Sequence, residues 1–298
     1  MAAPSSISYR IAHSTTYRYS VPVSVCHNVI MLTPCNTSEQ ICHSHRLTIR
    51  PTPVVTDHRT DLFGNHLHRF SLEENHSQLT ITATSHVTVH ARELQDTASE
   101  LTCGQLQLRL TNREDSNWLE VIPFVFNSPR IRRSDVFAEY GRVSVADDRS
   151  VIDAARDLTA RVFTDFKYDK NATNVHTPTE TAFAGRHGVC QDFSHVAVAC
   201  LRSCGIPTRY VSGYLRTVPA PGKPRLVGAD QSHAWISVYC GDQQGWVDFD
   251  PTNNCLCSTD HIVVAVGRDY GDVVPVKGVF LGGGDPALTV SVDVAPVD

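Results

Sequence analysis

Three of the chain's ten cysteines lie close together in the stretch GRHGVCQDFSHVAVACLRSCGIPTRY, residues 185–210. Cys190 follows a glycine-rich turn at the start of a predicted helix, whereas Cys200 and Cys204 lie further along that helix. The unpaired N–H groups and positive dipole end of a helix N-terminus stabilise a thiolate, and they can also hold an oxyanion. The position of Cys190 therefore favours a nucleophile, while we expect Cys200 and Cys204 to pack in the core.

A cysteine nucleophile needs a general base, and the base needs a group that orients it. His233 begins a predicted strand in SHAWISVYC, and a hairpin through CGDQQG would bring it beside the strand GWVDFDPTNN. Asp248 and Asp250 of that second strand face the same side, because side chains alternate along a strand. Either carboxylate could fix the imidazole tautomer and stabilise the imidazolium, and the residue pattern does not choose between them.

The elements that must position these residues divide the chain into three parts. Residues 1–90 show short alternating runs separated by turn signals, which predict an N-terminal antiparallel β-sandwich domain. Residues 91–150 have a weaker pattern and form a connecting region. Residues 151–298 begin with a helix capped by Asp148 or Ser150 and end in C-terminal β-strands. The third part is predicted to be the catalytic core, and the fold class is α+β.

Within this core, the cysteine-bearing stretch is expected to be an amphipathic helix. The residues Phe193, Val196 or Ala197, Cys200, Leu201 and Cys204 recur at three- and four-residue intervals, as the buried face of such a helix requires. Gly205 provides a left-handed stop, and Ile-Pro follows it. We expect this nucleophile helix to pack on an antiparallel sheet.

The overall composition is that of a globular protein. The 298 residues are 41% hydrophobic and 19% charged, with a formal net charge of -5 at pH 7. This charge argues against nucleic-acid and anionic-membrane partners, which favour basic surfaces. No secretory signal or membrane span is visible, so ten cysteines indicate reduced thiols and a cytoplasmic location.

The fifteen histidines and ten cysteines raise the possibility of a zinc site. However, the chain has no CxxC pair, and neither CHSH (42–45) nor CLC (255–257) has a matching second half. The histidines of CHSH lie in alternating sequence and are expected on the surface of a strand. We therefore predict no metal and no organic cofactor.

Three motifs in order resemble the core of the transglutaminase-like superfamily, in its bacterial branch. They are GVCQDFSHVAVACLRSCGIPTRYVSGY, SHAWISVY and GWVDFDPTNN. Upstream, YRIAHSTTYRYSVPV and DLFGNHLHRF resemble the N-terminal β domain that accompanies this core in many bacterial proteins. The resemblance covers nearly the whole chain. It implies a papain-like fold and the catalytic residues Cys190, His233 and Asp250, since Asp250 is the aspartate before Pro-Thr.

Asp192, in the first turn of the nucleophile helix, opposes thiolate formation by its charge but suits the helix dipole. We expect it to cap the helix or to anchor a neighbouring loop. Arg209 and Tyr210, at the start of the next strand, are its candidate partners.

The function expected is acyl transfer through a thioester, most simply hydrolysis of a peptide, isopeptide or amide bond in a peptide or protein substrate. Amine transfer to a protein glutamine, as in a transglutaminase, is the alternative. A silent peptide-binding scaffold is disfavoured by the intact Cys-His-Asp set, and a metalloprotein comes last. The sequence does not indicate an oligomeric state.

Overall fold

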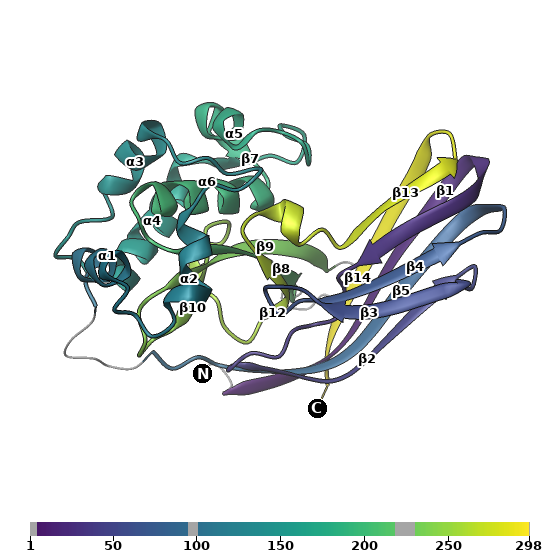
Figure 1. Cartoon of the computed structure of the whole chain (residues 1–298), viewed down its shortest axis with the longest axis horizontal. Coiled ribbons are helices and arrows are strands. Elements are labelled where there is room, and N and C mark those ends of the chain that lie inside the picture. The colour runs from purple at the N-terminus through teal and green to yellow at the C-terminus, as the bar shows by residue number, and fades with distance from the viewer. Residues whose placement is uncertain (1–4, 95–100, 218–229, 298) are drawn as a thin grey trace, which may run out of the picture.

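The computed structural model of the chain describes residues 5–94, 101–217 and 230–297. Figure 1 shows a strand-rich half beside a half in which helices gather around a second sheet. The longer pairings in both sheets are antiparallel, so the predicted α+β class with antiparallel sheets is confirmed. No helix within the described ranges is long and apolar enough to cross a membrane.

The strand-rich half is one sheet of seven strands arranged along the long strand β1. The first half of β1 pairs with β5 on one side and β14 on the other, and its second half pairs with β4 and β13. β2 lies outside β5, and β3 lies outside β4. The strands are β1 (Ser6–Ile30), β2 (Gln40–Arg50), β3 (Val55–Thr60), β4 (His66–Leu72), β5 (His76–His90), β13 (Val276–Gly282) and β14 (Pro286–Val297).

The sheet bends at one level, and four chain segments are interrupted there: β1, β2–β3, β4–β5 and β13–β14. The interruptions are a register shift in β1 and the short links 51–54, 73–75 and 283–285. Apolar side chains from both halves then meet in one cluster, which includes Phe70 of β4 and Ile81 of β5. The two layers of the predicted sandwich are therefore the two halves of a single bent sheet.

The C-terminal strands β13 and β14 complete this N-terminal sheet. Together they run antiparallel to almost the whole of β1, from Ile30↔Val276 to Ser8↔Val297. These strands were predicted to belong to the catalytic core, residues 151–298. Their alternating pattern predicts strands, but strand pairing between distant segments is not encoded in a local pattern.

The second half is built on a sheet of order β11-β10-β9-β8-β12, with helices packed against it. Its strands are β8 (Thr208–Leu215), β9 (Gln231–Tyr239), β10 (Trp246–Asp250), β11 (Cys255–Leu256) and β12 (His261–Gly267). A short parallel pair lies apart, β6 (Lys167–Tyr168) and β7 (His187–Gly188). The helices are α1 (Cys103–Asn112), α2 (Trp118–Val121), η1 (Ile122–Val125), α3 (Asp135–Arg142), α4 (Val151–Asp165), α5 (Thr179–Gly185), α6 (Cys190–Ser203) and η2 (Tyr270–Asp272).

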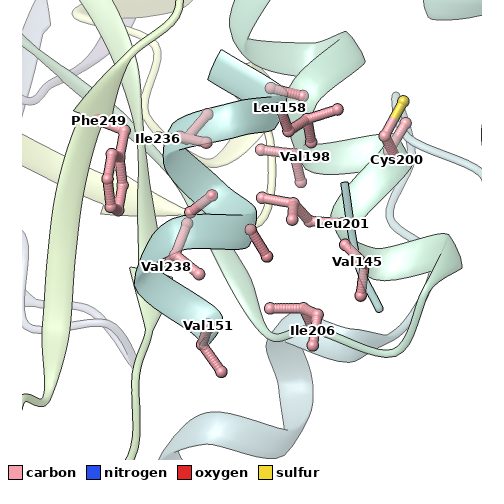
Figure 2. Close-up of a cluster of buried hydrophobic side chains, with 14 of the residues drawn as sticks. Val145, Val151, Leu158, Val198, Cys200, Leu201, Ile206, Ile236, Val238 and Phe249 are labelled. Atoms are coloured by element: carbon pink, nitrogen blue, oxygen red, sulfur yellow. The ribbon is translucent and has the colours of Figure 1, made fainter. Parts of the chain in front are cut away.

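The helices and β9–β10 share one apolar core (Figure 2). Val198 and Leu201 of α6 meet Leu158 of α4 and the strand residues Ile236 and Val238 there. The connecting region 91–150 also contributes to this core through α1 and α3. α1 was not predicted, although Thr102 and Gln105 form a capping box that is a sequence signal for a helix start. Ser150 caps α4, as one of the two predicted alternatives.

Helix α6 was predicted to have one buried face and one exposed face, but in the structure both faces are buried. Every residue from Asp192 to Arg202 is buried, including the polar face. The fully buried Arg202 donates hydrogen bonds to the carbonyl oxygens of Thr208 and Arg268. Arg202 is thus satisfied by backbone carbonyl groups of segments that cover the helix, which a helical period alone does not reveal.

The two halves of the molecule are joined by a third apolar cluster. Tyr9 and Ile11 of β1 pack with Tyr214, Ile262 and further residues of β8 and β12. His13 Nδ1 also lies 2.9 Å from the Tyr214 hydroxyl across this junction. The sheet that carries His233 therefore rests directly on the N-terminal sheet.

Candidate active site

Cys190 is the first residue of α6, as the sequence predicts. Val189 precedes it in an extended conformation and serves as the N-cap. The thiol is partly exposed and borders a small apolar cluster with Tyr210, Ala234 and Tyr270. Because the first N–H groups of a helix lack carbonyl partners within it, Cys190 lies where backbone donors can meet a developing oxyanion.

His233 lies between Cys190 and Asp250. Its Nε2 is 2.7 Å from Asp250 Oδ2, and its side chain is only 9% exposed. The pairing of β9 with β10 produces this contact, with Trp246 opposite Tyr239 and Phe249 opposite Ile236. The predicted hairpin is confirmed, and it leaves the other ring nitrogen, Nδ1, for the thiol.

The electrostatics of the pair favour an imidazolium at position 233. Burial opposes the charge, but hydrogen bonds with Asp250 and with the Cys190 thiol outweigh it and raise the pKa of His233 to about 10. Burial likewise opposes the charge of Asp250, yet the hydrogen bonds from His233 and His261 hold the pKa of its carboxyl far below its ordinary range. The carboxylate and the imidazolium stabilise each other.

Asp250 also binds two residues that the sequence analysis missed. His261 Nε2, from the start of β12, lies 3.1 Å from the same Oδ2, and Asn253 Nδ2 donates to it at 2.6 Å. The backbone N–H groups of Thr252 and Asn253 donate to Oδ1. The Asn253 contact lies within the DPTNN turn and could be inferred from that local sequence. His261 reaches Asp250 only through the pairing of distant strands in the sheet.

The structure distinguishes the two aspartates of β10. Asp248 Oδ2 accepts a hydrogen bond from the indole nitrogen of Trp235 at 2.9 Å and does not bind His233. The Trp235 ring packs edge-on against His261, with centroids 5.3 Å apart. Asp248 therefore fixes a tryptophan that borders the site, and Asp250 contacts the histidine.

Asp192 caps α6 and anchors a loop, as predicted. Its Oδ2 accepts hydrogen bonds from Val189 N at 2.8 Å and from the Thr173 hydroxyl at 2.6 Å. Gly188 permits this contact, because a Cβ there would overlap the Asp192 carboxylate. The bound loop precedes α5.

Neither predicted partner of Asp192 forms a hydrogen bond or ion pair with it in the described part of the chain, although the Asp192 charge helps to raise the pKa of Tyr210 after burial, the main cause. The Arg209 guanidinium lies 3.9 Å from the centroid of the Trp246 ring and donates to Ser237 Oγ at 3.3 Å. Tyr210 packs its ring on His195, with centroids 4.9 Å apart. The predicted pairing of Arg209 with Asp192 was therefore wrong, and Tyr210 does not hydrogen-bond to Asp192, since strand direction and twist decide where these side chains point.

The other two cysteines of the opening stretch are core residues. Cys200 is fully buried, and burial raises the pKa of its thiol strongly. Cys204 is partly buried, and burial raises its pKa as well. A raised pKa keeps a thiol protonated and unreactive, so both residues pack as predicted.

One group near the site has the composition of a metal site. The ligand atoms of His233, Asp250 and His261 lie within 4.8 Å of one another. In the observed arrangement both imidazole Nε2 atoms point at one carboxylate oxygen, at 2.7 and 3.1 Å. These short contacts are those of N–H donors, which cannot bind a metal until they lose the proton.

Comparison with known proteins agrees with this geometry. Residues 9–88 match the bacterial transglutaminase-like N-terminal region, and residues 139–251 match the transglutaminase-like superfamily. A Mycobacterium tuberculosis protein, Rv2569c, is 37% identical over 100% of this chain and 98% of its own length. The chain belongs to the transglutaminase-like superfamily.

Other members extend the similarity. The Mycobacterium leprae protein ML0607 is 33% identical over 96% of this chain and 97% of its own length. A solved structure from Cytophaga hutchinsonii, named "Putative Cysteine Protease", has the same fold, with a TM-score of 0.78 and 21% identity over 99% of this chain and 92% of that one. The superfamily match includes Cys190, His233 and Asp250, whereas His261 lies beyond it. The family therefore supports a cysteine-dependent enzyme.

Proposed function

We propose that the protein is a cysteine hydrolase that cleaves a peptide, isopeptide or amide bond through a thioester. The observation that carries the proposal is the position of His233, which interacts with a helix-N-terminal thiol on one side and with a buried carboxylate on the other. Among the other described cysteines, Cys200 is fully buried and Cys257 is buried, so neither thiol is placed to meet a substrate.

In the proposed mechanism Cys190 reacts as a thiolate beside the His233 imidazolium. The sulfur attacks the substrate carbonyl, and the N–H groups of the first turn of α6 stabilise the oxyanion. His233 then gives its proton to the leaving amine, which departs and leaves an acyl-thioester. His233, now neutral, takes a proton from water, and the hydroxide attacks the thioester to release the acid and restore the ion pair. Asp250 holds the imidazole in place throughout.

The superfamily match favours a second candidate, in which an amine replaces water in the last step. A primary amine would then form a new amide with the acyl group. Both reactions use the same thioester, so the site residues are the same for each.

The test combines a labelling assay with a product assay. Wild-type protein, Cys190→Ala and the control Cys200→Ala are treated with a thiol-directed probe and then with peptide and isopeptide libraries, with products identified by mass spectrometry. We expect Cys190→Ala to lose rapid labelling and to lower turnover at least about 10³-fold, while Cys200→Ala retains both. Labelling of Cys200 as fast as Cys190 would overturn the nucleophile assignment. Stable incorporation of a labelled amine would show that the enzyme catalyses amine transfer and would contradict the hydrolase proposal.

A further inference from the structure

A cavity of about 320 Å³ lies on the concave side of the core sheet, between β8, β10 and β12. The curvature of the sheet is evident at His261 of β12, which contacts Asp250 of β10 although two strands separate β12 from β10. Residues 37–40 and Arg92 also line the cavity. A space of this volume inside a curved sheet suits a small molecule.

Arg209 of β8 brings a positive charge to the wall of this cavity. The centre of its guanidinium lies 3.9 Å from the centroid of the Trp246 ring, and one N–H donates to Ser237 Oγ at 3.3 Å. Within the described residues the guanidinium forms no ion pair, and its Nε is buried without a hydrogen-bond partner. Burial lowers the pKa of Arg209 to about 10, although the charge of Asp248 opposes this effect. A guanidinium stacked on an aromatic ring keeps its edge available for a carboxylate, which would offset the cost of its burial.

Asp248 of β10 places a negative charge in the same wall. Arg209 lies opposite Ser237, and Ser237 lies opposite Asp248, so the three residues form one row across the sheet. Two strand spacings separate the backbones of the arginine and the aspartate by about 10 Å. Asp248 Oδ2 accepts the indole N–H of Trp235, and among the described residues no donor binds Oδ1. The row therefore matches a ligand that carries both an anionic and a cationic group.

The other titratable groups of the wall do not change this match. Arg92 Nη1 lies 3.1 Å from Glu39 Oε1, so these two charges are paired with each other. His261 Nε2 is bound to the carboxylate of the active site, and His90 is exposed at the end of β5. The arginine of β8 and the aspartate of β10 are the charges that remain for a ligand.

The cavity also has an apolar side, formed by Val89 of β5 and by Val263 and Val266 of β12. We propose that the cavity binds one free α-amino acid with an apolar side chain, its carboxylate on Arg209 and its ammonium group on Asp248. The side chain would lie against the valines. The site is separate from the Cys190 thiol and does not depend on the proposed function.

The first experiment compares ligands on the unmodified full chain by calorimetry. Leucine, valine and methionine are titrated beside two analogues of leucine, 4-methylpentanoate, which lacks the amine, and 3-methylbutylamine, which lacks the carboxylate. We expect one amino acid per chain and at least about tenfold weaker binding of each analogue, because each leaves one charge of the wall unpaired. Failure of all three amino acids to bind at millimolar concentration, or an analogue that binds as tightly as leucine, would overturn the proposal.

The second experiment locates the site with Arg209→Lys and Asp248→Asn. Each should weaken leucine binding at least about tenfold. Asp248→Asn keeps an acceptor for the Trp235 N–H and removes the repulsion of an anion, so it should bind 4-methylpentanoate at least as tightly as the wild type does. The matched controls are Arg109→Lys and Asp242→Asn, because these residues line another cavity, of about 400 Å³.

Thermal unfolding checks the folding of every variant and gives an independent measure of binding. Leucine should raise the unfolding midpoint of the wild type and of both controls, and should raise it less in Arg209→Lys and Asp248→Asn. If Arg209→Lys does not fold, Asp248→Asn and the two analogues still decide the result. Equal loss of binding in the controls would place the amino acid elsewhere and contradict the proposal.

Discussion

At the scale of single residues, the fully buried Asp250 carboxylate concentrates the polar contacts of the site. It accepts hydrogen bonds from His233, His261 and Asn253 on one oxygen, and from two backbone N–H groups on the other. Asp248, two residues earlier on the same strand, binds Trp235 instead. The two aspartates are thus a matched pair for testing which carboxylate serves the histidine.

We expect Asp250→Asn to reduce kcat/KM on the order of 10³–10⁴-fold, because an amide cannot stabilise the imidazolium or hold its tautomer. Asp248→Asn should reduce it less than about tenfold. The measurement is the rate of turnover and of thiol labelling for each variant, with folding checked by thermal unfolding. Equal losses in the two variants would show that β10 contributes through its structure and that Asp250 has no special role.

A second residue-scale prediction concerns pH. The pKa of His233 is raised from the ordinary value of 6.5 to about 10, so the folded protein binds this proton more tightly than the unfolded chain does. The resulting stabilisation is complete below about pH 6.5 and is lost as the pH rises through about 10. We expect the difference in free energy of unfolding between the wild type and His233→Gln to shrink over this range in urea titrations. A difference that stays constant or grows would contradict the charged pair.

At the scale of elements, the start of α6 determines where the nucleophile lies. Asp192 holds the N-cap of the helix and the loop at Thr173 together, and Gly188 leaves room for its carboxylate. The helix is then buried from Asp192 to Arg202, which restrains the first turn that carries Cys190.

We expect Asp192→Ala to cost about 1–3 kcal/mol of unfolding free energy, because the cap is lost and the backbone N–H of Val189 loses its acceptor. Labelling of Cys190 should slow, because the frayed first turn no longer fixes the thiol. Asp192→Asn keeps one acceptor oxygen and should show a smaller effect in chemical denaturation and labelling. If Asp192→Ala matched the wild type in both measurements, Asp192 would not be what orders the start of α6.

At the scale of the whole molecule, the last strand joins the two halves. β14 completes the N-terminal sheet through β1, and its residues Val292 and Val294 are buried in the cluster shared with β8 and β12. Val290, on the same face of the strand but beyond the junction, is 50% exposed. The effect of a substitution in β14 on the free energy of unfolding should therefore depend on its position along the strand.

We expect Val294→Asp to lower the unfolding free energy by about 3–5 kcal/mol, because it buries an unpaired charge between the two halves. Val290→Asp should change it by no more than about 0.5 kcal/mol. Thermal unfolding followed by circular dichroism and by the tryptophans of the second half measures both variants. Similar effects from the two substitutions would mean that the junction does not couple the halves.

Much of the site could be predicted from sequence because its signals are local. A cysteine at a helix start, the glycine stop at Gly205 and the hairpin between β9 and β10 each follow from neighbouring residues. The short hairpin loop fixes the strand register, and the register brings Asp250 to His233. The α+β class follows from the same local periods.

Other features required the tertiary structure, because they depend on contacts between distant segments. His261 reaches Asp250 only because β12 joins the far edge of the core sheet, and β13–β14 add to β1 across more than 200 intervening residues. The polar face of α6 is buried by segments distant in sequence. His45 lies near His68 because the N-terminal sheet bends. Local hydrophobic periodicity encodes neither feature. The sequence by itself indicated the thiol and the imidazole and narrowed the carboxylate to Asp248 or Asp250, with the family resemblance favouring Asp250; the tertiary structure brought Asp250 to His233 and decided what surrounds and supports the set, because those contacts join distant segments.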